Sequence, residues 1–433
     1  MSSGARAGDG AAADASAPLL PAKRAVRATG LQKSILSFAI LVKGGILGAY
    51  LPFCTLWLSR KGYSNTQLGI VAVIDAIFCL FLPMVGMVLD KLRSHNRGFI
   101  LLLILLTGLK LCYLPAAHSF VWILFLTAVT APLLRAANST LDALALYAMD
   151  RGSFPRIRLI GDLGWGIIAL GVGFAIDGAG SVDVVYWIFA VACGVLAVTW
   201  ACCSPWMATI RPDSEQMPLM EFASHLGSLY DVLDREACRA LLLLGIAGAG
   251  LGIISSFELV LLHQMHAPGY LLGLCKATGT LASIPVWWFT TPALDRMGIH
   301  NVQLLCLACM ALRLAIVGHI TNPWHALISE SMAGIGGFPL IYGSITVFSG
   351  RLVSEDLKGT CQTAIFVVFA GFGAGLSPLV GGMLAELVGI QMMFALVAVT
   401  LGMCFLSLIL HDVVTVSWRF IRDFDKAGLT AGP

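Results

Sequence analysis

The sequence predicts an all-α membrane protein with twelve transmembrane helices in two pseudo-symmetric six-helix halves. Three observations lead to this prediction: a mean hydropathy of +0.87, apolar runs as long as a membrane span, and motifs that repeat at a nearly constant offset. Apolar residues make up 58% of the 433 positions and charged residues 12%, whereas about 25% of a soluble domain is charged. The composition excludes a soluble enzyme, a disordered chain and a nucleic-acid-binding protein, and the net charge of +3 is too small for polyanion binding.

The apolar runs divide into twelve spans. Breakers between them include Arg60-Lys61-Gly62, Asp177-Gly178, Asn322-Pro323 and Gly389. The runs are too long for the alternating strands of a β-barrel. The predicted spans are residues 34–58, 67–89, 98–116, 119–148, 157–177, 183–204, 239–263, 269–291, 301–320, 324–349, 359–387 and 391–415. The predicted divisions are a disordered cytosolic tail at 1–33, a first half at 34–204, a cytosolic linker at 205–238, a second half at 239–415 and a cytosolic tail at 416–433.

The linker carries leucines at helical spacing beside acidic residues, which favours an amphipathic helix on the membrane surface. A plain linker is a better interpretation of it than a binding site for a partner. Basic residues give the orientation. With the N-terminus in the cytosol, 20 Lys and Arg lie in cytosolic segments or at cytosolic helix edges, five lie deep in spans, and Arg60 and Lys61 lie outside. Both termini are therefore expected to face the cytosol.

Two sets of motifs indicate an internal duplication. The turn from Gly86 to Lys91 matches residues 291–296 at an offset of 205, and a glycine-rich span that ends at Asp177 matches one that ends at Glu386 at an offset of 209. Two matches at nearly one offset favour parallel six-plus-six halves. Such an arrangement places a solute site between the halves, near the middle of the membrane.

The Gly86-x-x-x-Asp90-Lys91 turn resembles the loop signature of the major facilitator superfamily. Residues 141–165 and 311–334 are similar to the corresponding stretches of its lactose permease-like and phenylpropionate permease-like branch, with Ile160 and Asp162 where that branch has Trp and Ser. The resemblance implies secondary transport of a small organic solute by alternating access, with proton symport. An uncoupled facilitator or exchanger of the same fold, and a non-transporting receptor or scaffold, remain alternatives. Sugars, nucleosides and aromatic acids all remain open as solutes.

Charged residues near the cytosolic helix ends are candidate gating groups. Gly86 lets two helices approach, and Asp90 can bond a neighbouring helix end and the basic Lys91, which would latch the cytosolic side; a passive charged loop is the alternative. The predicted gating residues are Gly86, Asp90, Lys91, Asp142, Arg156, Arg158, Asp162, Asp295 and Arg296. Asp142 and Asp162 are assigned to this group because they lie on the cytosolic side near Arg156 and Arg158.

Charged residues deep in the spans are the candidate substrate and proton pathway. Each costs about 2.5–3.5 kcal/mol at mid-membrane, so these side chains must be paired or must face water. Permanent packing salt bridges are a reasonable alternative for half of them. The candidates are Lys43, Asp75, Arg135, Glu258, Lys276, Arg313 and Glu330. Lys110 is a further buried cation, and no role is assigned to it.

Depth along the helices suggests the pairs. Arg313 and Glu330 each lie about 12 Å from the turn at Asn322, and Glu258 and Lys276 flank the turn near residue 267 at matching depth. Through the family resemblance, Glu330 is the leading proton carrier, and Arg313 is expected to hold it ionised until the helices move.

In the first half the depth argument is weaker. Lys43 and Asp75 both lie in the central thickness and are the expected pair. Arg135 has no depth-matched partner, which makes it the best candidate for contacting an anionic or hydroxyl-rich solute.

No Walker loop, His-Glu-x-x-His motif or nucleophile elbow occurs, so the chain is not expected to be an enzyme. No metal or other cofactor is expected, and the proton gradient is the expected driving force. The expected partners are a small-molecule solute and the lipid bilayer, without nucleic acid, for a protein that functions as a monomer. Both the plasma membrane and an internal organelle membrane remain open.

Overall fold

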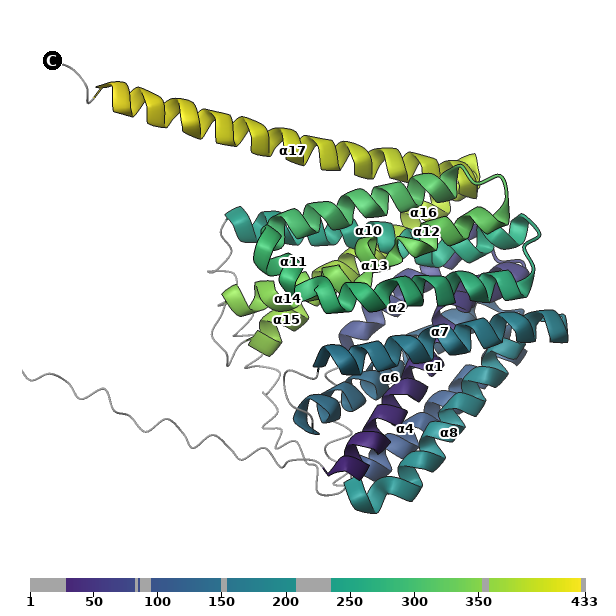
Figure 1. The fold of residues 1–433 in the computed structure, drawn as a ribbon. Coiled ribbons are helices and arrows are strands. Elements are labelled where there is room, and N and C mark those ends of the chain that lie inside the picture. Colours follow the sequence, from purple (N-terminus) through teal and green to yellow (C-terminus); the bar gives the residue numbers. More distant parts are fainter. Residues whose placement is uncertain are drawn as a thin grey trace, which may run out of the picture.

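The computed structural model describes residues 29–81, 85, 95–148, 154–207, 235–352 and 358–429. These residues are almost entirely helical and include no strand, which confirms the all-α prediction for the described part of the chain (Figure 1). Helices are the solution that lipid imposes, because an α-helix satisfies its backbone N–H and C=O groups within one segment.

The N-terminal half consists of α1 (Gly30–Arg60), α2 (Asn65–Phe78), the 3₁₀ turn η1 (Cys79–Phe81), α4 (His95–Leu111), α5 (Tyr113–Ala116), α6 (Phe120–Ala148), α7 (Phe154–Ala179) and α8 (Val184–Met207). Capping boxes begin α1 and α2. The Thr29 and Ser64 hydroxyls accept the backbone N–H of Gln32 and Gln67, and each glutamine side chain accepts the backbone N–H of its cap residue. Each box satisfies two N–H groups that a helix start leaves open.

The C-terminal half consists of α10 (Arg235–Gln264), α11 (Gly269–Gly318), η3 (Pro323–His325), α12 (Ala326–Ser331), α13 (Ala333–Gly336), α14 (Phe338–Leu352), α15 (Lys358–Phe366), the π-helical stretch η4 (Val367–Gly373), α16 (Ala374–Val388) and α17 (Ile390–Leu429). The chain turns inside α11 at Gly298, where φ is 79°. Glycine adopts this conformation without a Cβ clash. We call residues 269–297 the first limb of α11 and residues 299–318 its second limb.

Among the described residues, nine helices are long and apolar enough to span a membrane, or ten when the bent pair Pro323–Ser331 and Ala333–Ser349 counts as one span. The predicted twelve are therefore not fully confirmed. The two limbs of α11, which correspond to the predicted spans 269–291 and 301–320, count as one helix. The predicted span 67–89 is a shorter apolar helix, Asn65–Phe81, within the described part.

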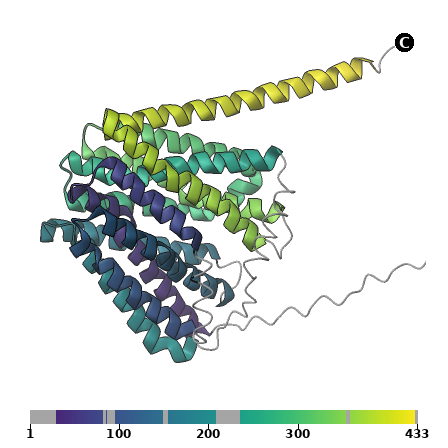
Figure 2. The same cartoon turned by 180° about the vertical axis from the view of Figure 1, so that it is seen from behind.

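One helix extends past its predicted end, and one predicted helix lies outside the described residues. The last predicted span ends at residue 415, but the backbone of α17 continues as a helix to Leu429 and projects from the bundle (Figure 2). The amphipathic helix expected in the linker falls at 208–234, outside the described residues.

The two halves form neighbouring bundles (Figures 1 and 2). In the first, α1 packs against α7 and α8, and in the second α11 packs against α14 and α17. Two helix pairs make most of the contact between the halves, α7 with α11 and α2 with α16, and α1 with α10 adds a smaller contact. We call the end of the bundle with the start of α1, the end of α8 and the start of α10 the linker end. The opposite end, with the short turns near residues 62, 181, 266 and 389, is the turn end.

Acidic side chains fasten both helix pairs at the turn end. Asp177 at the end of α7 accepts the backbone N–H groups of Gly269 and Tyr270, at 2.6 and 2.7 Å, where α11 begins. Glu386 at the end of α16 accepts the N–H of Thr66, at 2.9 Å, where α2 begins. Helix starts favour negative charge because their first N–H groups have no partner within the helix. The two acids occupy corresponding places in the repeat and make corresponding contacts between the halves.

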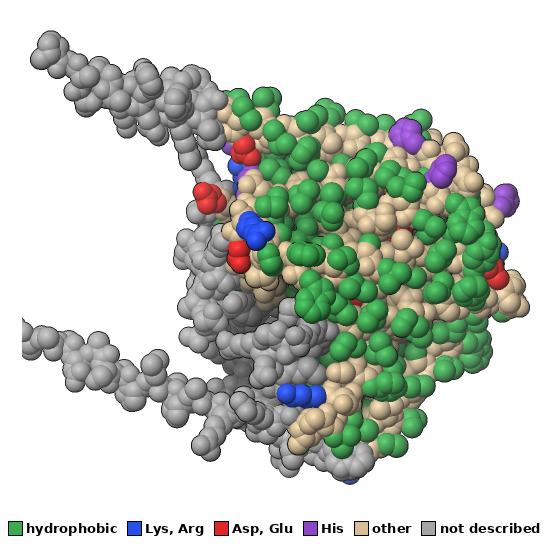
Figure 3. Space-filling model, in the orientation of Figure 1, with side chains coloured by type: hydrophobic (Ala, Val, Ile, Leu, Met, Phe, Trp, Pro, Cys, Tyr) green, Lys and Arg blue, Asp and Glu red, His purple; other side chains and the backbone are tan. Residues whose placement is uncertain are grey.

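The outer surface is mostly apolar. Hydrophobic side chains cover the middle of the face shown in Figure 3, and the charged side chains visible there gather toward the two ends of the bundle. Large apolar residues such as Val121, Val191 and Leu387 are exposed. A belt of this kind suits the hydrocarbon interior of a membrane.

Candidate functional site

Four charged side chains meet inside the C-terminal half. Lys276, on the first limb of α11, places its Nζ 2.5 Å from Oε2 of Glu258 on α10 and 2.5 Å from Oε1 of Glu330 on α12. Nη2 of Arg313, on the second limb, lies 3.4 Å from Oε2 of Glu330. The expected pairs Glu258–Lys276 and Arg313–Glu330 are both present, and Lys276 joins them into one network.

The surrounding backbone holds this network in place. Nε of Arg313 donates to the carbonyl of Ser329 at 3.1 Å, which fixes the guanidinium beside α12. Gly279 lies directly against Oε2 of Glu330, so any side chain at this position would collide with the carboxylate. A larger residue here would shift the carboxylate from its present position.

The two carboxylates of the network are not equivalent. Both oxygens of Glu330 contact a cation, whereas Oε1 of Glu258 is buried without a hydrogen-bond partner. With all four groups ionised the network is neutral. A buried acceptor without a donor costs about 1–3 kcal/mol, and more when it is charged. Glu258 is therefore the less well satisfied anion.

In the N-terminal half the structure corrects two predictions. Lys43 does not pair with Asp75. Its Nζ lies 2.5 Å from Oδ1 of Asp142 on α6. Asp75 instead pairs with Arg135, Nη2 to Oδ2 at 3.4 Å, so the prediction that Arg135 has no partner is also wrong. The physical reason is helix rotation. The rotation of α1 and α6 about their axes decides which face of each helix points inward, and depth along the helix does not reveal it.

Among the described intramembrane pairs, Asp75–Arg135 is the most open, with side-chain exposures of 31% and 40%. Charged side chains with this exposure in the middle of spans face water rather than lipid. Lys110 lies nearby in α4 but is 2% exposed. Its Nζ lies 3.8 Å from the ring centroid of Tyr50 and 4.7 Å from that of Tyr113.

A further bond crosses between the halves nearer the linker end. Nε1 of Trp287, on the first limb of α11, donates to Oδ2 of Asp162 on α7 at 2.6 Å. Beyond it lies an aromatic cluster in the C-terminal half. The cluster consists of Trp287, Phe338, Tyr342, Phe366 and Phe369.

The other predicted gating residues are placed unevenly. Gly86, Asp90 and Lys91 lie outside the described residues, as do the side chains of Arg156 and Arg158. Asp142 belongs to the Lys43 pair. Asp295 and Arg296 are exposed just before the turn at Gly298. The proposed loop latch thus stays a prediction.

Sequence reasoning missed three kinds of functional contact. Lys110 was counted but given no role, although an intramembrane lysine is itself a signal. Asp177 and Glu386 lie at helix edges and are absent from the predicted site residues, although their matching places in the repeat are a signal that identifies them. The Asp162–Trp287 bond has no signal in one sequence, because it depends on how two distant helices face each other.

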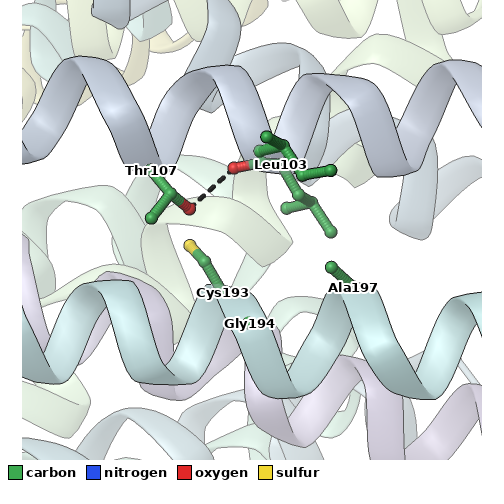
Figure 4. A pocket seen from close by; sticks show the side chains of 6 residues that line it. Leu103, Thr107, Cys193, Gly194 and Ala197 are labelled. Atoms are coloured by element: carbon green, nitrogen blue, oxygen red, sulfur yellow. Dashed lines mark hydrogen bonds between the residues drawn. The ribbon is translucent and has the colours of Figure 1, made fainter.

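A hollow of about 150 Å³ lies between α4 and α8 (Figure 4). It is lined by Leu103, Ile104, Thr107, Cys193, Gly194 and Ala197. The Thr107 hydroxyl donates to the carbonyl of Leu103 at 2.7 Å. The described residues include no group of three or more His, Cys, Asp or Glu side chains that could hold a metal ion.

Comparison with known proteins gives relatives along most of the chain. "Putative nucleoside transporter YegT" of Escherichia coli (strain K12) is 26% identical over 378 residues, which cover 81% of this chain and 84% of YegT. "Uncharacterized MFS-type transporter YhhS" of the same organism is 26% identical over 180 residues, which cover 41% of this chain and 40% of YhhS. The chain thus matches less than half the length of YhhS.

Solved structures match the fold. A crystal structure of the nucleoside transporter NupG superposes with a TM-score of 0.71 at 17% sequence identity, covering 87% of this chain and 98% of NupG. This likeness confirms the multi-pass helical fold. The sequence profile of the MFS_1 like family matches residues 34–396. The chain therefore belongs to the MFS_1 like family, within the major facilitator superfamily.

Proposed function

We propose that the protein is a secondary active transporter that couples the movement of a small organic solute to protons by alternating access. The buried network of Glu258, Lys276, Arg313 and Glu330 is the main support, because four charges in the dry interior of one half have a clear use as a proton site. The relatives named as nucleoside transporters make uridine the first solute to test. In this scheme the halves rock at the α7–α11 and α2–α16 contacts.

Within the network, Glu258 is a better candidate for the proton carrier than Glu330. The family resemblance suggested Glu330. A proton on Glu258 neutralises the carboxylate that has a buried oxygen without a donor, and Lys276 keeps Glu330 as its partner. A proton on Glu330 would leave Arg313 without a full counter-charge. The network thus gains one proton most easily at Glu258, and loses it when that carboxylate reaches water.

The test is uridine uptake into proteoliposomes with an acidic exterior, measured beside uridine exchange at equal pH. Glu258→Gln mimics the protonated acid, so this variant should exchange uridine at a rate near that of the wild type but fail to accumulate it. Glu330→Gln removes a carboxylate from two cations. Breaking such a buried pair costs about 3–5 kcal/mol, so this variant should fold poorly.

Each alternative predicts a different result. Full accumulation by Glu258→Gln would exclude it as the carrier and return Glu330, then Asp75, to first place. A facilitator would equilibrate uridine in the wild type without accumulating it at any pH difference. A receptor or scaffold would show no saturable uptake of uridine or of any organic acid.

A further inference from the structure

The charges around Arg135 do not balance. Among the described residues, two buried or half-buried cations, Lys110 and Arg135, lie beside a single carboxylate, that of Asp75. Asp75 contacts Arg135 and also acts on Lys110 through its charge, without contacting it. Two further acids in the described spans of this half are engaged elsewhere. Asp142 holds Lys43, and Asp162 lies toward the linker end, bonded to Trp287.

Aromatic rings hold Lys110 without cancelling its charge. Tyr50 and Tyr113 present their ring faces to the ammonium, and cation–π contacts of this kind stabilise a desolvated cation. Among the described residues, no carboxylate lies within 4.0 Å of this ammonium group. Within that part of the chain, Lys110 is therefore a buried cation without a counter-ion in contact.

The charged groups meet at one depth. Tyr50 and Asp75 each lie about 15 Å from the turn end along their helices. Lys110 lies closer to that end and Arg135 deeper, but side chains on a helix tilt toward its N-terminus. This tilt carries the ammonium of Lys110 inward and the guanidinium of Arg135 outward. All four groups thus converge where the Asp75–Arg135 pair is open to water.

We propose that the transported solute is an organic monoanion, with a carboxylate recognised by Arg135 and with Lys110 supplying the otherwise unmatched positive charge. The inference rests on the proposed transport function and adds the charge of its substrate. The planar guanidinium presents two parallel donors that fit a carboxylate. Bound there, one carboxylate brings the local count to two cations and two anions. A neutral solute would leave Lys110 uncompensated.

The first test is binding to purified full-length protein in detergent, with three pairs of probes that differ in charge: orotate and uracil, benzoate and benzamide, gluconate and sorbitol. The carboxylate of at least one pair should bind about ten- to a hundredfold more tightly than its neutral counterpart, as expected for a hydrogen bond to a charged group. Neutral members that bind as tightly as the acids would overturn the proposal.

Variants assign the preference to Lys110. Lys110→Gln should bring the two affinities within a pair close together, whereas Lys110→Arg should keep them apart. The melting temperature of Lys110→Gln should equal or exceed that of the wild type, since an uncompensated buried cation is removed. Lys61→Gln, which removes a surface lysine at the turn end, is the matched control and should keep the preference. An unchanged preference in Lys110→Gln would overturn the role of Lys110.

These experiments can contradict the charge preference and the transport function independently of each other. A carboxylate that binds but is never accumulated in proteoliposomes would contradict the proposed transport function and leave the charge preference standing. Accumulation of uridine or sorbitol in preference to every acid would contradict the monoanion and leave proton-coupled transport standing.

Discussion

Asp183 at the turn end shows how one exposed charge is held by its neighbours. Its Oδ1 accepts a hydrogen bond from Nε1 of Trp57 at 2.7 Å, and Nζ of Lys61 donates to Oδ2 at 3.1 Å. Partial burial alone would raise the pKa of Asp183, but the hydrogen bonds from Lys61 and Trp57 outweigh it and lower the pKa below its usual value. All three residues belong to the N-terminal half.

A lowered pKa makes the stability contribution of Asp183 depend on pH. The carboxylate stabilises the fold fully above the pKa that aspartate has in the unfolded chain, and this contribution is lost as the pH falls through the lower folded value. Asp183→Asn should therefore cost about 1 kcal/mol or less at pH 7, as for other exposed pairs. The cost should fade below about pH 4. Thermal unfolding of the wild type and the variant in detergent, at pH 7 and below about pH 4, measures this cost. An equal cost at both pH values would contradict the lowered pKa of Asp183.

The ion pairs inside the membrane were predictable from the sequence only where one turn joins the helices of both partners and so fixes their depths. Arg313 and Glu330 flank one turn, and Glu258 and Lys276 flank another, so equal distances from the turn place each pair at one depth. Lys43 and Asp142 are 99 positions apart in sequence, and their contact depends on the rotation of α1 against α6. One sequence carries no measure of that rotation.

At the scale of elements, the α7–α11 and α2–α16 pairs decide how the halves separate. Their close contact depends on glycines. A Cβ on Gly173 would lie 2.5 Å from the carbonyl oxygen of Gly269, so neither helix could approach with a larger residue there. Small residues at such crossings are typical of membrane helix packing. The caps from Asp177 and Glu386 add charge to both crossings at the turn end.

The double variant Asp177→Asn with Glu386→Gln should loosen the turn end. An anion at a helix start contributes about 0.3–1 kcal/mol, so hydrogen exchange at the starts of α2 and α11 should quicken about two- to fivefold at each helix. Exchange within residues 65–78 and 269–280, measured by mass spectrometry, tests this. Asp183→Asn is the matched control, because its bonds stay within one half. Unchanged exchange in the double variant would show that glycine packing alone closes this end.

Hydropathy predicted most elements but not their internal irregularities. Apolar length alone marks a span, and the described helices follow the predicted spans apart from their edges. The π-helical stretch η4 lies in an apolar run that carries no break in hydropathy. The 60° bend between Pro323–Ser331 and Ala333–Ser349 follows polar residues around Glu330, but hydropathy alone does not distinguish a bent span from a straight span with a polar site.

At the scale of the whole molecule, the orientation of the bundle in the membrane decides which side of the membrane each site faces. The start of α1, the end of α8 and the projecting part of α17 all lie at the linker end (Figure 1). The three segments therefore share one side of the membrane. Basic residues favour the cytosolic side for that end. The turn end, with Arg60, Lys61 and the caps at Asp177 and Glu386, would then face outward.

Cysteine labelling in intact cells tests this orientation with a matched pair of positions. Ser214→Cys lies in the linker between α8 and α10, and Thr321→Cys lies at the turn end beside η3, where the residue is exposed. A membrane-impermeant thiol reagent added outside should label Thr321→Cys above the background of the native cysteines, and should label Ser214→Cys only after the cells are opened. The asymmetry of 20 basic residues against two is the reason, since positive charge is retained on the cytosolic side. Labelling of Ser214→Cys from outside would show that the assigned orientation is reversed, because the linker end, which α1, α8 and α17 share, would then face outward. The proton site would then have to be loaded from the opposite side.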